Sequence, residues 1–393
     1  MIELLRQYID NWGYKPSEKG SVKLVVIQPT TFCNLDCDYC YLPDRQLKYK
    51  LSLELIEPIF RNIFASDLID LRGFTIVWHA GEPLTVPISF YTAAIQIIDK
   101  LNQEINPNPY QIEHSLQTNA TMITQEWCDF IKEYDLRIGV SIDGPDFIHD
   151  AHRRTRTGKG THASTMRGIK LLQNNQIPFS VIAVLSDISL DYPDEIFDFF
   201  LENKIRYVGF NIEEIEGTNR SSSLQNNGVD ERYRNFMQRF YGRVKEAENL
   251  LQVREFDDLY SLICQKYSFQ GQFTPFTMIN IAHNGDFSTF SPELLSMKSD
   301  VYGDFILGNI TQHDLRSIDQ TDKFKKLDRD IQAGVKMCQK TCPYFSLCGG
   351  GAPANKYYEN GTFRSTETIY CRYTKKIIAD IILEALEKKL GIV

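Results

Sequence analysis

Three cysteines near the N-terminus, Cys33, Cys37 and Cys40, have a C-x3-C-x2-C spacing that suits metal chemistry. They follow a largely apolar run, 22–27, which is typical of a buried strand. Three thiolates can bind three irons of a four-iron, four-sulfur cube, because each iron needs one protein ligand beyond its sulfides. The fourth iron would stay open, and an open metal position is typical of a catalytic centre. One alternative is a zinc site, but residues 42–78 contain no fourth Cys or His to complete it. The other alternative is that the three cysteines are unrelated and simply buried.

A second group of four cysteines lies near the C-terminus: Cys338, Cys342, Cys348 and Cys371. Four thiolates can fully ligate a second iron–sulfur cluster, and the glycines at 349–351 would allow close backbone approach to its sulfides. A structural four-cysteine zinc site is the alternative, and the spacing does not separate iron from zinc. Two other cysteines, Cys128 and Cys264, fall in amphipathic helical runs, where a small buried thiol is ordinary.

The elements that must position these cysteines are six strand-like runs that alternate with amphipathic helical runs. Strands are expected at 22–28, 74–78, 111–118, 137–142, 179–185 and 207–212. Helices are expected at 53–65, 89–103, 125–133, 162–174, 194–202 and 230–246. Apolar strands alternating with helices indicate parallel βαβ units, so we predict an α/β fold with a partial (β/α)6 TIM-like barrel. Its chemistry would collect at the C-terminal ends of the strands, and a doubly wound sheet is the alternative.

The composition indicates a soluble globular protein. Its 393 residues are long for one domain, and 42% hydrophobic residues suffice for a large core. No window of eighteen apolar residues is present and residues 1–15 lack a signal-peptide pattern, so we expect a cytoplasmic protein with no membrane partner. A net charge of −8 argues against a nucleic-acid partner. Nine cysteines without a secretion signal indicate metal ligands before disulfides.

Aromatic residues on each side of the third cysteine, Tyr39 and Tyr41, complete a motif that resembles the signature of radical S-adenosylmethionine (SAM) enzymes. In that family the open iron of a [4Fe-4S] cluster takes the amino and carboxylate groups of SAM. One electron then splits SAM to methionine and a 5′-deoxyadenosyl radical, which abstracts a hydrogen atom from the substrate. The resemblance therefore implies SAM as cofactor and a flavodoxin-like or ferredoxin-like protein as external electron donor.

Motifs at the predicted strand ends resemble the SAM-binding motifs of the same family. Residues 81–83 match G-E-P, in which Glu82 would bind the SAM amino group; a Gly-Pro turn with a solvated Glu is the alternative. The run 117–121 is similar to Q-T-N-G-T, but Ala120 replaces the Gly, so we expect that the turn needs no positive φ. The run 141–145 resembles S-I-D-G-P. The resemblance implies these SAM contacts: Tyr39, Gly81, Glu82, Pro83, Thr118, Asn119, Ser141 and Asp143 (ribose), Arg153 (carboxylate) and Val184 (adenine).

Three stretches follow the sixth predicted strand. Residues 213–216 carry polar groups that could contact substrate or simply be solvated. Residues 219–228 are rich in Ser, Asn and Gly and are expected to form a mobile surface loop. From about residue 277 the pattern changes to a hairpin, with strands at 278–282 and 287–290 and an Asn-Gly turn between them.

The C-terminal cysteines resemble the SPASM or twitch extension of radical SAM peptide maturases, which favours iron over zinc. A full SPASM domain carries two auxiliary clusters on seven cysteines, whereas this chain has Ala352 and Phe290-Ser291 at two of those positions. We therefore expect one auxiliary [4Fe-4S] cluster, on the four C-terminal cysteines. The expected division of the chain is an N-terminal segment (1–22), a radical SAM partial barrel (23–247), a connecting helical segment (248–276), a SPASM/twitch-like module (277–376) and a C-terminal helix (377–393).

The runs 285–294, 348–356 and 359–363 resemble the cyclophane-forming maturases of glycine-rich-repeat precursor peptides, also called triceptide synthases. That resemblance implies oxidation of a ribosomally made precursor peptide. A Cβ hydrogen leaves a residue two positions after an aromatic one, the carbon adds to the ring, and one electron and one proton are lost. Glu293, just after the predicted hairpin, is the candidate proton acceptor. Because few residues precede Cys33, precursor recognition would use the barrel, the C-terminal module or a separate protein.

Three other functions stay open. A sulfatase maturase would oxidise Ser or Cys to formylglycine, but the missing SPASM cysteines count against it. A non-catalytic iron–sulfur carrier or peptide-binding scaffold would not cleave SAM, and the motifs at 81–83 and 141–145 count against it. A nucleic-acid modifier is disfavoured by the acidic composition.

Overall fold

The computed structural model describes residues 21–391 except 71, 249, 265–270 and 296. Its strands are β1 Leu24–Ile27, β2 Phe74–Trp78, β3 Ile112–Thr118, β4 Arg137–Ser141, β5 Phe179–Leu185, β6 Tyr207–Ile212, β7 Gln252–Val253, β8 Met278–Ile281, β9 Asp286–Ser288, β10 Lys298–Ser299, β11 Gly303–Asp304 and β12 Gly308–Asn309. Its helices are α2 Ile56–Phe64, α3 Ile88–Ile105, α4 Gln125–Glu133, α5 Asp146–His152, α6 His162–Asn174, α7 Pro193–Glu202, α8 Val229–Glu246, α9 Arg254–Cys264, α10 Asp322–Thr341, α11 Phe345–Cys348, α12 Pro353–Asn360, α13 Ile369–Cys371 and α14 Ile378–Leu390. A π-helical segment, Arg372–Ile377, joins α13 to α14.

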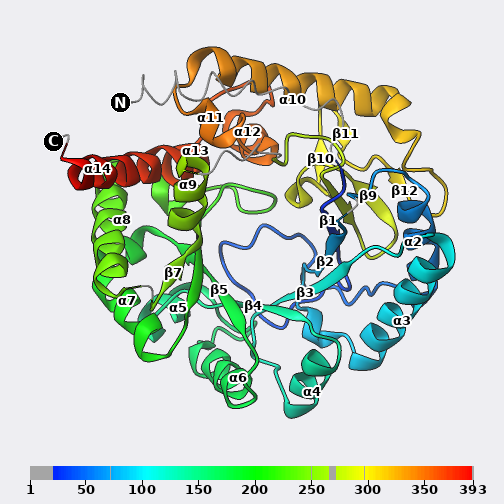
Figure 1. Ribbon diagram of the computed structural model, residues 1–393, viewed down its shortest axis with the longest axis horizontal. Helices are drawn as coiled ribbons and strands as arrows, with labels where there is room; N and C mark the ends of the chain where they lie inside the picture. The colour runs from blue at the N-terminus through cyan, green and yellow to red at the C-terminus, as the bar shows by residue number, and fades with distance from the viewer. Residues whose placement is uncertain (1–20, 71, 249, 265–270, 296, 392–393) are drawn as a thin grey trace.

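The strands β1 to β6 lie side by side in sequence order, and each pairs with its neighbour in parallel. Figure 1 shows the sheet curving around the centre of the molecule, with α2, α3, α4, α6, α7 and α8 on its outer side. A doubly wound sheet would reverse its strand order and carry helices on both faces. The prediction of a parallel α/β fold that curves as a partial barrel is therefore confirmed.

The predicted strands and helices of the barrel are all present and differ from the prediction only at their ends. Of the helices that the structure describes, α5, α10, α11, α12 and α13 were not predicted. The apolar residues of α10 recur at helical spacing, as in Phe324, Leu327, Ile331 and Val335, and all four are buried. That periodicity could have predicted the helix. Among the helices of the described residues, none has the length and apolar character that crossing a bilayer requires.

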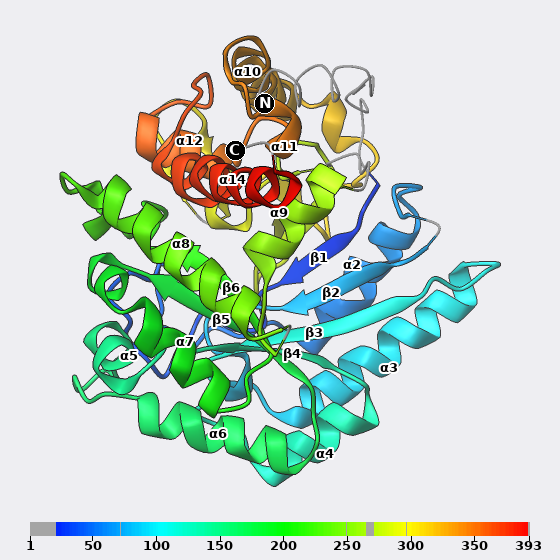
Figure 2. The same ribbon diagram turned by 60° about the vertical axis from the view of Figure 1, so that its left-hand side comes forward.

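The predicted C-terminal hairpin is present as β8 and β9, and it continues the barrel sheet. Strand β8 pairs in parallel with β1, so that Asn280 lies opposite Val26, and β9 runs antiparallel to β8. Figure 1 shows the helices α10, α11, α12 and α14 between α8 and β12, and in Figure 2 the same helices lie together at one end of the molecule. Helix α14 packs against α8 and α9. The C-terminal cysteines are thereby held beside the open side of the barrel.

The prediction for the turn after β3 was wrong. Ala120 takes a left-handed conformation, with φ of +61°, although it has a side chain. Contacts on both sides hold the turn, because the Asn119 N–H donates to Glu82 and the Ala120 N–H donates to Thr118 Oγ1. These contacts offset a cost of about 1–2 kcal/mol for a left-handed L-residue.

The stretch 219–228 was predicted as a surface loop, but part of it is buried. Leu224 is 1% exposed, and its carbonyl accepts a hydrogen bond from the Tyr373 hydroxyl at 3.1 Å. Ser222 Oγ donates to the Glu213 carbonyl at 2.5 Å. The C-terminal helical segment covers this stretch, a contact that local composition does not reveal.

Candidate active site

The three N-terminal cysteines lie in the loop that leaves the C-terminal end of β1, where barrel chemistry is expected. Two arginines hold this loop: Arg156 donates to the Cys33 carbonyl at 3.0 and 3.1 Å, and Arg45 donates to the Cys37 carbonyl at 2.8 Å. Burial raises the pKa of both Cys33 and Cys37 to about 12. Thiols shielded in this way ionise when positive charge compensates the thiolate, which the irons of a cluster would supply.

The G-E-P motif after β2 forms the first group of predicted SAM contacts. The buried Glu82 carboxylate accepts from Thr118 Oγ1 at 2.7 Å, from the Asn119 N–H at 2.8 Å and from the Leu84 N–H at 3.0 Å. Burial raises the pKa of Glu82, and these hydrogen bonds oppose the rise. The motif's remaining residues, Gly81 and Pro83, begin the same turn.

Gly81 brings the G-E-P turn against the cysteine loop. Its φ is +63°, and an added Cβ would lie 2.6 Å from the carbonyl oxygens of Thr30 and Phe32. The loop is also joined to β3, because Asn119 Nδ2 donates to Asn34 Oδ1 at 2.9 Å. The structure thus brings Glu82 and the cysteine loop together, as a cofactor shared between them would require.

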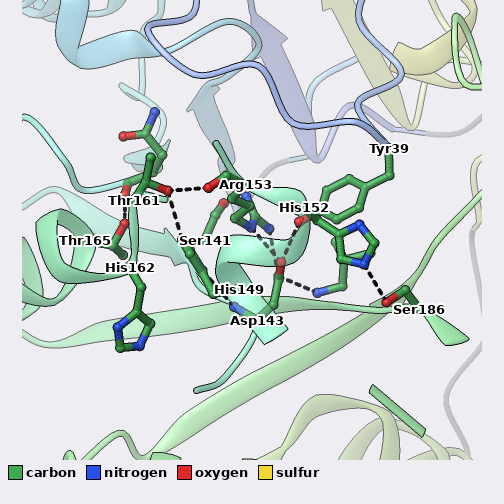
Figure 3. A network of polar contacts seen from close by, with 12 residues as sticks. Tyr39, Ser141, Asp143, His149, His152, Arg153, Thr161, His162, Thr165 and Ser186 are labelled. Atoms are coloured by element: carbon green, nitrogen blue, oxygen red, sulfur yellow. Dashed lines mark hydrogen bonds and ion pairs between the residues drawn. The ribbon is translucent and has the colours of Figure 1, made fainter. Parts of the chain in front are cut away.

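Asp143, at the end of β4, is the centre of a second group of predicted SAM contacts (Figure 3). Its carboxylate accepts from the Tyr39 hydroxyl at 2.6 Å, from Arg153 at 2.9 and 3.0 Å, and from the Val184 N–H at 2.9 Å. Burial acts to raise the pKa of Asp143, but the Arg153 guanidinium outweighs it and holds the pKa below its usual value. Ser141 stands apart from this group and accepts from Gln117 Nε2 at 2.9 Å.

Replacing Arg153 by methionine should destabilise the protein by about 3–5 kcal/mol, because the buried Asp143 carboxylate would lose its ionic partner. Asp143 is 1% and Arg153 7% exposed, so water cannot compensate. Urea unfolding of the metal-free protein at neutral pH measures the loss. The matched control is Arg154→Met at the exposed neighbouring position, which should change the free energy of unfolding by about 0.5 kcal/mol or less. Equal loss in both variants would contradict the ion-pair assignment.

The four C-terminal cysteines line one cavity of about 100 Å³. Cys338 lies in α10, Cys342 directly follows α10, Cys348 ends α11 and Cys371 ends α13. Gly350 and Gly351 also line it, with φ of +121° and +79°. Within the described residues, no three His, Cys, Asp or Glu side chains converge on a single metal ion. A four-iron cluster does not need such convergence, because each cysteine binds a different iron. A cavity walled by four thiols fits an iron–sulfur cluster.

Two cysteines, Cys128 and Cys264, lie outside these two groups. Cys128 is fully buried in α4, as expected of a small core thiol. Cys264 is the last residue of α9, and its side chain lies outside the described part of the structure.

A cavity of about 340 Å³ lies between the end of β6, α9 and the C-terminal module. Four glutamates line it, Glu214, Glu216, Glu255 and the predicted proton acceptor Glu293. Asn355 of α12 donates to Glu214 Oε2 at 2.7 Å, and Arg254 of α9 also lines the cavity. In the described part of the chain, Glu293 Oε2 is shielded from solvent and has no hydrogen-bond partner. The stretch after β6, which the sequence left open between substrate contact and solvent, therefore faces a cavity.

The environment favours protonation of Glu214, Glu216 and Glu293. Burial raises the pKa of Glu293 to about 7, and the charge of Glu214 adds to this rise. Burial likewise raises the pKa of Glu214 to about 7, and it raises the pKa of Glu216 well above its usual value. Carboxyls with pKa values near neutrality can accept and return protons at physiological pH.

A second, smaller cavity of about 100 Å³ lies beside Tyr41, His79 and Asn280, which sequence reasoning missed. The Tyr41 hydroxyl lies 3.4 Å from His79 Nε2, and burial lowers the pKa of His79 to about 4. Asn280 is 1% exposed, and its Oδ1 has no partner among the described residues. The available signals were a histidine just before the G-E-P motif and a polar residue in an apolar strand.

Comparison with known proteins gives a family and a set of relatives. The sequence model of the radical SAM superfamily matches residues 27–200. An uncharacterised protein of Synechocystis is 49% identical over 375 residues, 95% of this chain and 94% of that protein. A serine-type anaerobic sulfatase-maturating enzyme of Bacteroides thetaiotaomicron is 28% identical over 356 residues, 85% of this chain and 83% of that enzyme.

Two solved structures share the fold. Native anSMEcpe with bound AdoMet and the Cp18Cys peptide has a TM-score of 0.75 at 20% identity, covering 94% of this chain and 98% of that one. Streptococcus suis SuiB bound to the precursor peptide SuiA has a TM-score of 0.60 at 15% identity, covering 94% and 79%. At these identities the likeness concerns the fold.

Proposed function

This chain belongs to the radical SAM superfamily, and from that premise we propose that it oxidises a ribosomally made precursor peptide. The product is a three-residue cyclophane, in which an aromatic ring is joined to the Cβ of a residue two positions later. Support for a peptide substrate comes from two fold neighbours that hold peptides in their solved structures. Support for the cross-link comes from the resemblance of residues 285–294, 348–356 and 359–363 to cyclophane-forming maturases.

The proposed cofactor site combines the two groups of residues at the strand ends. Cys33, Cys37 and Cys40 would hold a [4Fe-4S] cluster, with Glu82 and Arg153 on the SAM side of it. When bound, SAM and the cluster supply a 5′-deoxyadenosyl radical that can remove a hydrogen atom from carbon. The chain's own contribution is to position these groups, because hydrogen bonds already hold the Glu82 carboxylate and the Arg153 guanidinium in place.

The observation that carries the proposal of a peptide oxidation is the unpartnered Glu293 oxygen in the 340 Å³ cavity, whereas the choice of a cyclophane product rests on the resemblance. That volume lies in the ~300–1,000 Å³ range typical of small-ligand sites. Cyclophane formation removes two hydrogen atoms in all, the first as an atom from Cβ and the second as a proton and an electron from the ring carbon. Glu293 accepts that proton, and its pKa of about 7 permits it to release the proton afterwards.

The peptide is proposed to lie along both cavities. Pro292 and Leu295 line the smaller one and Glu293 lines the larger one, so the turn after the hairpin borders both. In the smaller cavity, Asn280 Oδ1 offers an acceptor for a peptide N–H of the substrate. An extended segment would therefore pass the end of β1 and reach the carboxyl that accepts the proton.

A second candidate function is oxidation of Ser or Cys to formylglycine, as the names of the sulfatase-maturating relatives suggest. The observation in its favour is identity that extends over 85% of the chain. Against it stand Ala352 and Phe290-Ser291, where a full SPASM domain has cysteines. Both reactions need a proton acceptor, so the acidic cavity does not choose between them.

Product analysis tests the proposal. The enzyme is incubated anaerobically with SAM, a reductant and a glycine-rich-repeat precursor peptide, and separately with a sulfatase peptide. We expect the precursor to lose two hydrogen atoms, to show a cross-link in tandem mass spectra and not to react with a hydrazide. A hydrazide-reactive aldehyde on the sulfatase peptide, with the precursor unchanged, would replace the cyclophane proposal by formylglycine formation.

A further inference from the structure

Lys356 is a buried cation beside a proposed cluster ligand. The residue is 4% exposed, and its Nζ lies 3.3 Å from the Sγ of Cys338. Among the residues that the structure describes, that sulfur is the only hydrogen-bond partner of Nζ, and no carboxylate forms a salt bridge with it. An ammonium group removed from water needs compensating negative charge, and a neutral thiol does not provide it.

The sequence around Lys356 explains how it reaches this position. Helix α12 begins at Pro353, directly after the glycine turn at 349–351. Consecutive residues of a helix point in different directions, and here Asn355 donates to Glu214 in the acidic cavity while Lys356 enters the cysteine-lined cavity. Helix α12 therefore has one side chain in each cavity.

The two cavities share a wall. Ala352 lines both of them, and the π-helical segment after Cys371 contributes Lys375 to the acidic cavity and Lys376 to the cysteine-lined one. The Lys376 ammonium pairs with Glu367, so its charge is already compensated. The charge of Lys356 has no such carboxylate partner in the described part of the chain, and it faces the thiols.

We infer that Lys356 is a positioning residue that raises the reduction potential of the iron–sulfur cluster held by the four C-terminal cysteines. The inference rests on the proposed function, in which the substrate gives one proton to Glu293 and one electron to an acceptor. Reduction adds one negative charge to a cluster and its thiolates, and a fixed positive charge against Cys338 stabilises the reduced form more than the oxidised form. Lys356 thereby favours electron transfer from the substrate cavity into the cysteine-lined cavity.

The test uses the full-length chain with Cys37→Ala, so that the C-terminal cluster alone is observed. Lys356→Met, Lys356→Arg and the exposed Lys336→Met, two residues before Cys338 on α10, are made in that background. Iron and sulfide assays report cluster content, and a potentiometric titration followed by electron paramagnetic resonance reports the midpoint potential. We expect about four irons per chain in every variant. Lys356→Met should shift the midpoint potential downward, whereas Lys356→Arg and Lys336→Met should leave it close to the parent's.

The outcomes separate this inference from the proposed function. An unchanged potential in Lys356→Met with full iron content would overturn the inference and leave the second cluster in place. Loss of iron in both Lys356→Met and Lys356→Arg would overturn it too, since packing and not charge would then be the role. Absence of iron from the parent Cys37→Ala protein would overturn both the inference and the assignment of a second cluster.

Discussion

Replacing Cys37 by alanine is expected to abolish SAM cleavage and to remove about four of about eight irons per chain. A cluster with an open iron needs all three thiolates of the β1 loop, and without it no electron reaches SAM. The measurement is iron, sulfide and zinc content after anaerobic reconstitution, together with chromatographic detection of 5′-deoxyadenosine in the presence of a strong reductant.

Two control variants give this result its meaning. Cys338→Ala should also lose about four irons but should still cleave SAM, because the C-terminal cavity is separate from the β1 loop. Cys128→Ala, a fully buried thiol of α4, should keep both the iron content and SAM cleavage. About four irons and one zinc in the unmodified protein would mean that the C-terminal site is a structural zinc site. Absence of iron from the unmodified protein would contradict the proposed radical SAM mechanism.

The second large effect is expected from Glu293→Gln, which should lower cross-linked product by ~10²–10⁴-fold, the usual contribution of a positioned acid–base group. SAM cleavage should continue, because Glu293 lies in the cavity beside the C-terminal module and not among the SAM contacts. Product and 5′-deoxyadenosine are quantified in the same reaction, so that the loss of coupling between them is measured directly.

The pH dependence follows from the same carboxyl. Burial raises the pKa of Glu293 to about 7, and only the deprotonated form accepts a proton. Product formation in the unmodified enzyme should therefore rise as the pH increases through about 7 and level off above it. The control is Asp258→Asn, an exposed carboxyl that lines the same cavity, which should leave rate and pH profile near those of the unmodified enzyme. Full turnover by Glu293→Gln would remove this residue from the mechanism.

The sequence by itself determined the strands and helices of the barrel and located the cysteine loop after β1 and the motifs at the strand ends. Apolar periodicity is a property of neighbouring residues, so the strands from β1 to β6 and the helices between them could be assigned without contacts. The three cysteines of the β1 loop lie within eight positions, and their spacing alone proposes a shared cluster. The residues that meet at Asp143 were each identified singly, by the motifs at their strand ends.

The tertiary structure decided which of these residues meet and what surrounds them. Glu214 and Glu293 are far apart in the chain, and they share a cavity only because the segment after the β8–β9 hairpin lies near the segment after β6. The sequence did not single out Lys356, because only the placement of α12 brings its side chain against Cys338. The turn at Ala120 was expected to need no positive φ, but contacts from Glu82 and Thr118 hold Ala120 at a φ of +61°. In each case the physical reason is that contacts between distant segments, and not local propensity, set the conformation and the charge environment.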